Sequence, residues 1–309
     1  MDDIGSKIIK LKKDLNAVIL SHFYQDDEIQ DIADFVGDSL DLSRKAAATD
    51  ADIIILCGVR FMAEVAKILN PSKKVLIPDM NAGCSLEDSC KPNEFAKFRE
   101  KHPDHIALTY INCSAEIKAL SDIIVTSTNA MKIVNQIPKD QKIIFAPDRH
   151  LGSYISKQTE RDMLLWHGSC IVHEQFSEKE LIKLQVRHPK AKIIAHPECP
   201  ENLLSYAHHI GSTSSLLKFT TENIGQEFIV LTEPGIIHQM KKLNPTGKFY
   251  DCPGIDQSGC VLCNTCPYMQ LNTLEKLYQV MKNQNNEIIL EDHLMKKASS
   301  SLEKMLKMS

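Results

Sequence analysis

The sequence has no long apolar run, no excess of positive charge and no low-complexity linker. No stretch approaches the roughly 18 apolar residues that a membrane-spanning helix needs, so we expect no membrane partner. The net charge of -4 argues against a general nucleic-acid-binding surface. The first residues lack the basic stretch and apolar core of a signal peptide, which predicts a cytoplasmic protein.

The rest of the composition is that of a globular protein. Apolar residues make up 43% of the 309 residues and charged residues 25%, enough for two or three small domains with their own cores. The chain also has ten cysteines. In a cytoplasmic protein, so many cysteines indicate metal or redox chemistry more often than a disulfide framework.

A pattern of polar residues occurs three times along the chain. Three apolar runs each end in a pair of polar residues that are separated by one other residue. The first members of the three pairs stand at positions 22, 110 and 196, so they are 88 and then 86 residues apart. A hydroxyl residue follows 17 positions after each first member, and a cysteine follows 43 to 53 positions after the hydroxyl. The three sets are His22, Tyr24, Ser39 and Cys84; Tyr110, Asn112, Ser127 and Cys170; and His196, Glu198, Thr213 and Cys266. Such a period predicts one structural unit used three times, with a site where the units meet.

Each repeat alternates short apolar runs with helical segments. The runs lack polar alternation, which is typical of parallel strands covered on both faces. We therefore predict an α/β fold of three αβα sandwich units, related by a pseudo-threefold axis, with short parallel sheets around a central active site. The predicted units are 1–87, which includes an N-terminal amphipathic helix at 4–15, 88–174 and 175–270, followed by a helical tail at 271–309 broken near 283–286. The predicted strands are 17–20, 53–56, 75–77, 106–109, 143–145, 163–165, 192–195, 228–231 and 248–250.

The polar pairs lie at the carboxyl ends of predicted strands. Ligands of open parallel sheets bind beyond those ends, so we expect the pairs and the three cysteines to face one cavity.

Three of the cysteines, Cys260, Cys263 and Cys266, form C-x2-C-x2-C before Pro267. This spacing resembles half of a ferredoxin-type cluster motif without its fourth ligand, and it also suits zinc with one further ligand. Alternatively, only one of the three binds, and Cys84 and Cys170 complete the set. Three thiolates on a [4Fe–4S] cluster would leave one open iron that can act as a Lewis acid. Taken singly, Cys84 and Cys170 would be buried inert thiols, but their equivalent repeat positions favour ligation.

Nine short motifs together resemble the quinolinate synthase family. They span about residues 19–268: SHFYQ at 21–25, GDS at 37–39, MNAGCS at 80–85, TYINC at 109–113, PDRHLG at 147–152, WHGSCIVH at 166–173, HPEC at 196–199, GST at 211–213 and CPYM at 266–269. The resemblance implies an enzyme of NAD biosynthesis that condenses iminoaspartate (iminosuccinate) with dihydroxyacetone phosphate to quinolinate, phosphate and water. It implies a [4Fe–4S] cluster with one open iron. It also implies that L-aspartate oxidase or aspartate dehydrogenase supplies the imine.

The resemblance also assigns residues. The cluster ligands correspond to Cys84, Cys170 and Cys266. The catalytic candidates are Tyr24, Tyr110, His196 and Glu198. The substrate-binding candidates are His22, Ser39, Tyr110, Ile111, Asn112, Ser127, His173, His196, Pro197, Glu198 and Thr213.

These residue types suit the implied chemistry. Ser39, Ser127 and Thr213 are each predicted to open a helix, where free N–H groups favour anions, although serine and threonine also serve as ordinary N-caps. Glu198 is the best acid–base candidate, because a carboxylate in a cavity partly closed to water can have a raised pKa and transfer protons near neutrality. The tyrosines could donate hydrogen bonds to developing negative charge, and the histidines could bind anions or relay protons.

The residues alone are also compatible with two other functions. One is a different three-cysteine cluster enzyme, such as a hydroxymethylbutenyl diphosphate reductase or a radical enzyme of diphthamide synthesis. The other is a non-enzymatic iron–sulfur redox sensor. The polar strand ends in all three repeats favour a dicarboxylate-binding enzyme, because a sensor has no need for them.

Overall fold

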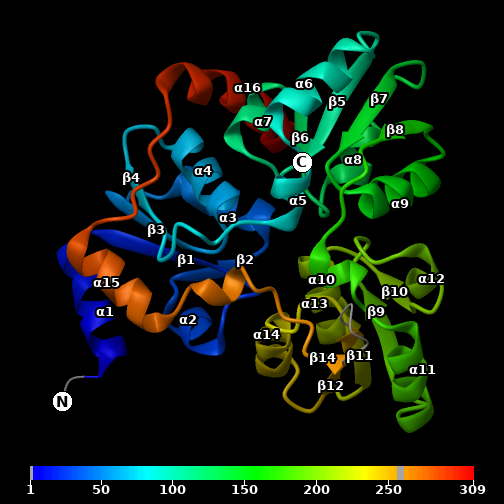
Figure 1. The fold of residues 1–309 in the computed structure, drawn as a ribbon. Helices are drawn as coiled ribbons and strands as arrows, with labels where there is room; N and C mark the ends of the chain where they lie inside the picture. Colours follow the sequence, from blue (N-terminus) through cyan, green and yellow to red (C-terminus); the bar gives the residue numbers. More distant parts are fainter. Residues whose placement is uncertain (1–2, 256–260) are drawn as a thin grey trace.

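A computed structural model describes residues 3–255 and 261–309, and three parallel four-stranded sheets form its framework (Figure 1). The first sheet has the order β2-β1-β3-β4, the second β6-β5-β7-β8 and the third β10-β9-β11-β12. The strands are β1 Ala17–His22, β2 Phe35–Gly37, β3 Ile53–Cys57, β4 Lys74–Leu76, β5 His105–Tyr110, β6 Ile123–Val125, β7 Lys142–Ala146, β8 Met163–Leu165, β9 Lys192–Ala195, β10 His209–Ile210, β11 Glu227–Leu231 and β12 Lys248–Asp251. A small antiparallel pair, β13 Gly254–Ile255 and β14 Val261–Leu262, follows the third sheet.

The helices flank the three sheets. They are α1 Ile4–Asp14, α2 Asp27–Ile32, α3 Ser39–Ala48, α4 Arg60–Leu69, α5 Ser85–Ser89, α6 Pro92–Glu100, α7 Ala115–Ala119, α8 Ala130–Val134, α9 Arg149–Thr159, α10 Ile171–Glu174, α11 Glu178–Arg187, α12 Glu201–Leu204, α13 Thr213–Glu222, α14 Ile236–Leu243, the 3-10 turn η1 Met269–Leu271, α15 Leu274–Asn283 and α16 Asp292–Met308. Side-chain oxygens of Asp38, Asp148 and Ser212 cap α3, α9 and α13 by accepting backbone N–H bonds.

The predicted α/β class is confirmed, because all nine predicted strands form and their sheets are parallel. The central strands are buried over most of their length, as in β3, where all five residues are buried. Each sheet also has a fourth strand that the sequence did not indicate: β2, β6 or β10. These strands have only two or three residues and pair with the outer side of β1, β5 or β9.

The C-terminal helices pack on the first and second sheets. The tail forms two helices, and the break between them contains Gln284 and Asn286 with positive φ, as predicted near 283–286. In the core, α15 packs with α1 beneath the first sheet. The longer α16 packs on α4 from the first sheet and on α7 and β6 from the second (Figure 1). One continuous apolar core therefore connects the first and second sheets.

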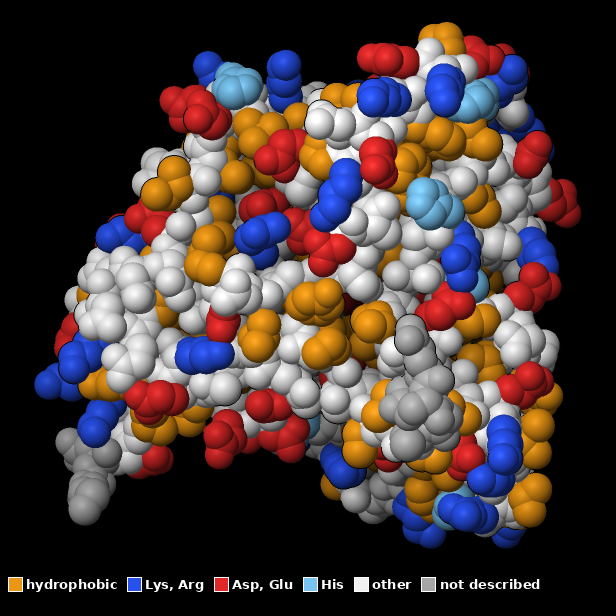
Figure 2. All heavy atoms as spheres, in the orientation of Figure 1, with side chains coloured by type: hydrophobic (Ala, Val, Ile, Leu, Met, Phe, Trp, Pro, Cys, Tyr) orange, Lys and Arg blue, Asp and Glu red, His pale blue; other side chains and the backbone are white. Residues whose placement is uncertain are grey.

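Two further features concern the hydrophobicity of the helices and the charges on the surface. Among the helices of the described residues, none combines the length and the hydrophobicity needed to cross a bilayer. Figure 2 shows that charged side chains of both signs are spread over one face of the molecule, with a small group of hydrophobic side chains near its centre.

Candidate functional site

The carboxyl ends of the three sheets meet at one pocket with an empty volume of about 710 Å³. Residues that follow β1, β5 and β9 reach it, as do the loops that carry the three repeated cysteines. Thirteen of the predicted site residues line it: His22, Tyr24, Ser39, Cys84, Tyr110, Asn112, Ser127, Cys170, His173, His196, Glu198, Thr213 and Cys266. The repeat pattern therefore identified residues that share one cavity.

Two predicted site residues do not line this pocket. Ile111 is buried in the apolar core and borders a smaller cavity beside Ser39. Pro197 is buried between His196 and Glu198. Both lie next to lining residues in the chain, so their side chains support the pocket wall instead of forming it.

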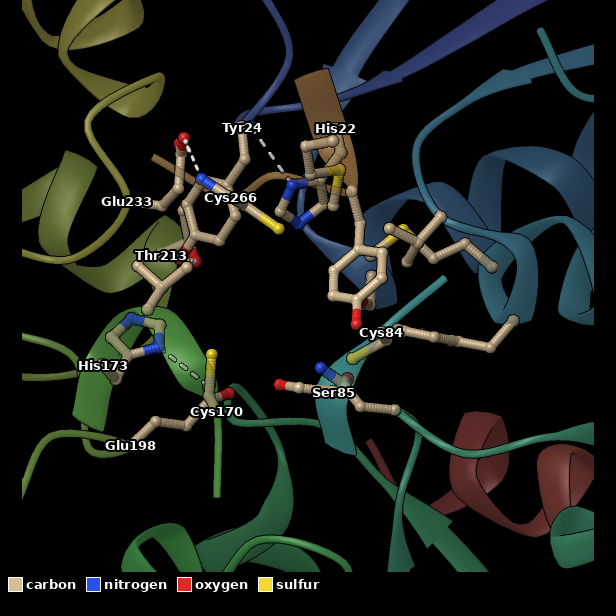
Figure 3. Close-up of a pocket in the computed structure, with 18 of the residues that line it drawn as sticks. His22, Tyr24, Cys84, Ser85, Cys170, His173, Glu198, Thr213, Glu233 and Cys266 are labelled. Atoms are coloured by element: carbon tan, nitrogen blue, oxygen red, sulfur yellow. Dashed lines mark hydrogen bonds and ion pairs between the residues drawn. The ribbon is translucent and has the colours of Figure 1, made fainter. Parts of the chain in front are cut away.

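The three repeated cysteines point into the pocket from different loops (Figure 3). Cys84 and Cys170 are the N-cap residues of the short helices α5 and α10, and Cys266 precedes η1. Burial raises the pKa of each thiol, to about 11 for Cys266, although backbone N–H groups two or three residues further on oppose this shift. Three thiols that share a cavity and lie beside backbone N–H groups that favour the thiolate suit a metal–sulfur cluster, whose ligands must be thiolates.

The cysteine-bearing loops are also held against each other. Ile171 donates its backbone N–H to Ser85 Oγ at 3.0 Å, which joins the residues that follow Cys170 and Cys84. Gly168 allows this approach, because a Cβ there would collide with the side chain of Ser89, at the end of the helix α5 that Cys84 caps. The loops therefore keep their thiols on the same side of the cavity.

The other cysteines of the C-x2-C-x2-C motif are placed differently. Cys263 is exposed and does not line the pocket, whereas Cys266 does. Cys260 lies outside the described residues. Within the described part of the chain, the only cluster of three possible metal ligands is Cys170, His173 and Glu198, whose ligand atoms lie within 4.8 Å of one another. Cys263 therefore lies outside the group of thiols that shares the pocket.

The first and third repeats hold a histidine in the same way. Tyr24 donates its backbone N–H to His22 Nδ1 at 3.2 Å, and Glu198 donates its backbone N–H to His196 Nδ1 at 3.3 Å. Burial lowers the pKa of His22 to about 4 and that of His196 to about 3. Both rings are therefore neutral at pH 7 with the proton on Nε2, which makes that nitrogen a hydrogen-bond donor.

The lowered pKa of His22 makes a testable contribution to stability. Since its ordinary value is 6.5 and its value in the folded protein is about 4, the unfolded chain binds the proton more tightly between these values. This group therefore lowers the free energy of unfolding as pH falls, by about 1.4 kcal/mol for each pH unit.

His22→Gln should remove that slope. Denaturant unfolding of both proteins between about pH 4.5 and 7.5 measures the difference. The free energy of unfolding of the wild type, minus that of the variant, should decrease below about pH 6.5. Parallel curves for the two proteins would show that burial of His22 does not affect its titration.

Glu198 is the centre of a buried hydrogen-bonded group. Tyr110 Oη donates to Glu198 Oε1 at 2.6 Å, and His173 Nδ1 lies 2.9 Å from Oε2. Burial alone would raise the pKa of Glu198, but the attraction of His173 and the hydrogen bond from Tyr110 outweigh it and lower the pKa. The predicted raised pKa is therefore wrong, and Glu198 is an ionised carboxylate that can accept a proton.

Tyr24 belongs to a second hydrogen-bonded group. Its hydroxyl lies 2.7 Å from Thr232 Oγ1 and 3.1 Å from Thr213 Oγ1, and His173 Nε2 lies 3.0 Å from Thr232 Oγ1. Burial raises the pKa of Tyr24 and Tyr110 well above 10.0, so both phenols keep their protons. Thr232 thus connects Tyr24 to His173, and through it to Glu198.

The sequence analysis did not single out several residues of the pocket region, among them Asp38, Thr232 and Glu233. Asp38 and Glu233 line the pocket, and burial raises the pKa of Glu233 to about 8. Glu233 accepts backbone N–H bonds from Gly235 and Cys266, so it braces the Cys266 loop. The signal for Thr232 and Glu233 was their position directly after β11, and Asp38 stands within the GDS motif.

The three repeated hydroxyls are not equivalent in detail. Ser39 and Thr213 are the first residues of α3 and α13, and their predecessors Asp38 and Ser212 are the caps. Ser127 lies in a turn before α8, so the prediction that it opens a helix is wrong. Two further pocket atoms, Asn112 Oδ1 and Thr126 Oγ1, are buried without a hydrogen-bond partner among the described residues. Unpaired buried polar atoms that line a cavity favour a polar ligand there.

Known proteins resemble the chain over its whole length. The family model NadA, described as "Quinolinate synthetase A protein", matches residues 6–307. A protein from Ehrlichia chaffeensis named "Quinolinate synthase" is 61% identical over 303 residues, which cover 98% of this chain and 96% of that protein. Proteins with the same name from Gloeothece citriformis and Synechocystis sp. are each 60% identical over 307 residues, covering 99% of this chain and 94% and 96% of theirs.

Proposed function

Because the chain belongs to the quinolinate synthase family, we propose that its central pocket condenses iminoaspartate with dihydroxyacetone phosphate to form quinolinate, phosphate and water. The single observation that supports this most strongly is the convergence of three thiols and the polar residues of all three repeats on one pocket. A redox sensor needs the thiols but not the other groups.

The pocket offers several neutral donors for the negatively charged substrates. His22 and His196 hold their protons on Nε2, and Ser39, Ser127 and Asn112 line the same pocket. We assign these residues and Thr213 to the carboxylate and phosphate groups of the substrates. Ile111 and Pro197 support them from behind.

Glu198 and the two tyrosines are suited to proton transfer. The ionised carboxylate of Glu198 can accept a proton from a carbon next to a carbonyl or imine group, and Tyr110 is positioned to stabilise it by a hydrogen bond of 2.6 Å. Tyr24 keeps its proton and can donate a hydrogen bond to a developing oxyanion. His173 and Thr232 orient both groups.

Cys84, Cys170 and Cys266 would hold a [4Fe–4S] cluster with one open iron. When bound, the cluster would supply Lewis-acid activation for the loss of water. The imine must come from oxidation of an amino dicarboxylate, for which L-aspartate oxidase or aspartate dehydrogenase is the proposed supplier.

An anaerobic preparation tests the proposal. The purified protein should contain about four iron and four sulfide ions for each chain, as a single [4Fe–4S] cluster requires. It should form quinolinate when oxaloacetate-derived imine and dihydroxyacetone phosphate are both present, as measured by chromatography. Protein that carries the cluster but forms no quinolinate would overturn the proposed reaction.

Ser127→Ala should weaken dicarboxylate binding at least tenfold, which corresponds to about 1.4 kcal/mol. A lost hydrogen bond to a charged group explains this size. The melting temperature should barely change, because Ser127 caps no helix. Calorimetric titration of the holoenzyme with malate gives the affinity, and thermal unfolding gives the stability.

Ser114→Ala is the matched control for this prediction. Ser114 is a true N-cap, since its Oγ accepts the backbone N–H of Ile117, and it does not line the pocket. Its loss should cost about 1 kcal/mol of stability and leave malate affinity unchanged. Unchanged affinity in Ser127→Ala would remove Ser127 from the anion site.

A further inference from the structure

We propose that Asp38 is a positioning residue whose single carboxylate fixes the substrate-anion groups of the three sheets relative to one another. Asp38 is buried, with only 5% of its surface exposed, and it borders the pocket. It follows β2 of the first sheet, yet it accepts hydrogen bonds from residues of the second and third sheets.

The hydrogen bonds of Asp38 reach all three repeats. Oδ2 accepts from Thr128 Oγ1 at 2.7 Å and from Ser214 Oγ at 2.7 Å. Oδ1 accepts the backbone N–H groups of Leu40 and Asp41, each at 3.0 Å. Each oxygen therefore has two donors. The donors to Oδ1 fix the start of α3, and the donors to Oδ2 connect Asp38 to the second and third repeats.

These donors are adjacent to the repeated hydroxyl residues. Asp38 directly precedes Ser39, Thr128 directly follows Ser127, and Ser214 directly follows Thr213. Neither Thr128 nor Ser214 lines the pocket, whereas their neighbours Ser127 and Thr213 do. The carboxylate therefore anchors the chain beside each pocket-facing residue without using the hydroxyls of Ser39, Ser127 and Thr213 themselves.

Because the carboxylate of Asp38 is buried, its hydrogen bonds have to stay intact. A buried carboxylate is stable only when charge-assisted hydrogen bonds replace its hydration. Its donors lie in α3, in the turn before α8 and in α13, so a shift of any one of these segments leaves an oxygen of the buried carboxylate with fewer donors.

The direct test removes the two inter-sheet donors and leaves Asp38 in place. Thr128 is exposed and Ser214 is half-buried, so the double variant Thr128→Val/Ser214→Ala should fold. We expect the KM for iminoaspartate to rise at least tenfold, and malate affinity of the holoenzyme to fall by a similar factor. The kcat should change less than threefold, because the acid–base residues are untouched.

Ser215→Ala is the matched control. Ser215 lies in the same first turn of α13, but its hydroxyl pairs with His209 of the third sheet at 2.9 Å. Its removal should leave KM and malate affinity unchanged. A double variant with lower melting temperature but unchanged KM and malate affinity would show that the Asp38 contacts are merely structural.

Two substitutions of Asp38 itself test whether malate affinity can be lost and then recovered. Asp38→Ser keeps a short acceptor for the α3 amides but cannot reach Thr128 and Ser214, so we expect the same rise in KM. Asp38→Asn keeps the shape and can donate to both hydroxyls, so it should recover at least half of the lost malate affinity on a logarithmic scale. Equal losses in both variants would overturn the positioning role.

This inference rests on the proposed anion site, and the same titrations separate the two. A wild-type holoenzyme that binds no malate and forms no quinolinate would contradict the proposed function. A wild type that binds malate, beside a double variant that binds it equally well, would contradict only the role of Asp38.

Discussion

Replacing Cys170 with serine should abolish both the visible absorbance of the iron–sulfur cluster and quinolinate formation. Cys170 lies in the pocket with Cys84 and Cys266, and a serine hydroxyl is a hard, weakly acidic group that does not replace a thiolate on iron. The same loss is expected for Cys84→Ser and Cys266→Ser. Absorbance, iron content and sulfide content of anaerobically purified protein measure the effect, and circular dichroism confirms the fold.

Cys263→Ser is the matched control, because Cys263 precedes Cys266 by one C-x2-C step but is exposed and does not line the pocket. This variant should keep its cluster and its activity. If Cys263→Ser loses the cluster while Cys266→Ser keeps it, the third ligand is wrongly assigned. If all four variants keep it, the cluster is bound elsewhere.

Glu198→Gln should lower turnover by about 10²-fold or more, while the fold and the cluster stay intact. Glutamine can still accept the hydrogen bond from Tyr110, but it cannot take up a proton. The ionised state of Glu198, which results from its hydrogen-bonded surroundings, is what this substitution removes. Steady-state turnover of cluster-loaded protein at saturating substrate gives the measurement.

Tyr110→Phe tests whether the two residues act as a pair. Since Tyr110 donates to Glu198 at 2.6 Å, the double variant Tyr110→Phe/Glu198→Gln should lose much less activity than the product of the two single losses. Fully multiplicative losses would mean that the residues act independently. Near wild-type turnover of Glu198→Gln would remove Glu198 from the mechanism.

The sequence predicted the larger elements because their signals are strong. Strands such as β3 are continuous runs of buried apolar residues, and only a parallel sheet covered on both faces accommodates several of them. The strands β2, β6 and β10 were missed because two or three residues carry no periodicity. Their formation depends on the neighbouring strand, which no local pattern records.

The site residues that could be predicted from the sequence are those that occupy equivalent positions in the three repeats. His22, Tyr110 and His196 share one position in the three repeats, and all three line the pocket. Thr232 occurs in only one repeat, so the period gave no reason to choose it. The pKa of Glu198 was predicted in the wrong direction because burial was visible from the sequence, whereas its contacts with His173 and Tyr110 were not.

The strand pairings and the pocket contacts differ in the length of chain that they enclose. Every pairing in the three main sheets joins strands from the same repeat, as in Ala17 with Ile53 or His105 with Lys142. The pocket contacts close much longer loops: 88 residues separate Tyr110 from Glu198, and 208 separate Tyr24 from Thr232. Loops of that length close later during folding than the sheets do. The ability to bind substrate should therefore be acquired last on refolding and lost first under mild denaturation, while the helices and sheets persist.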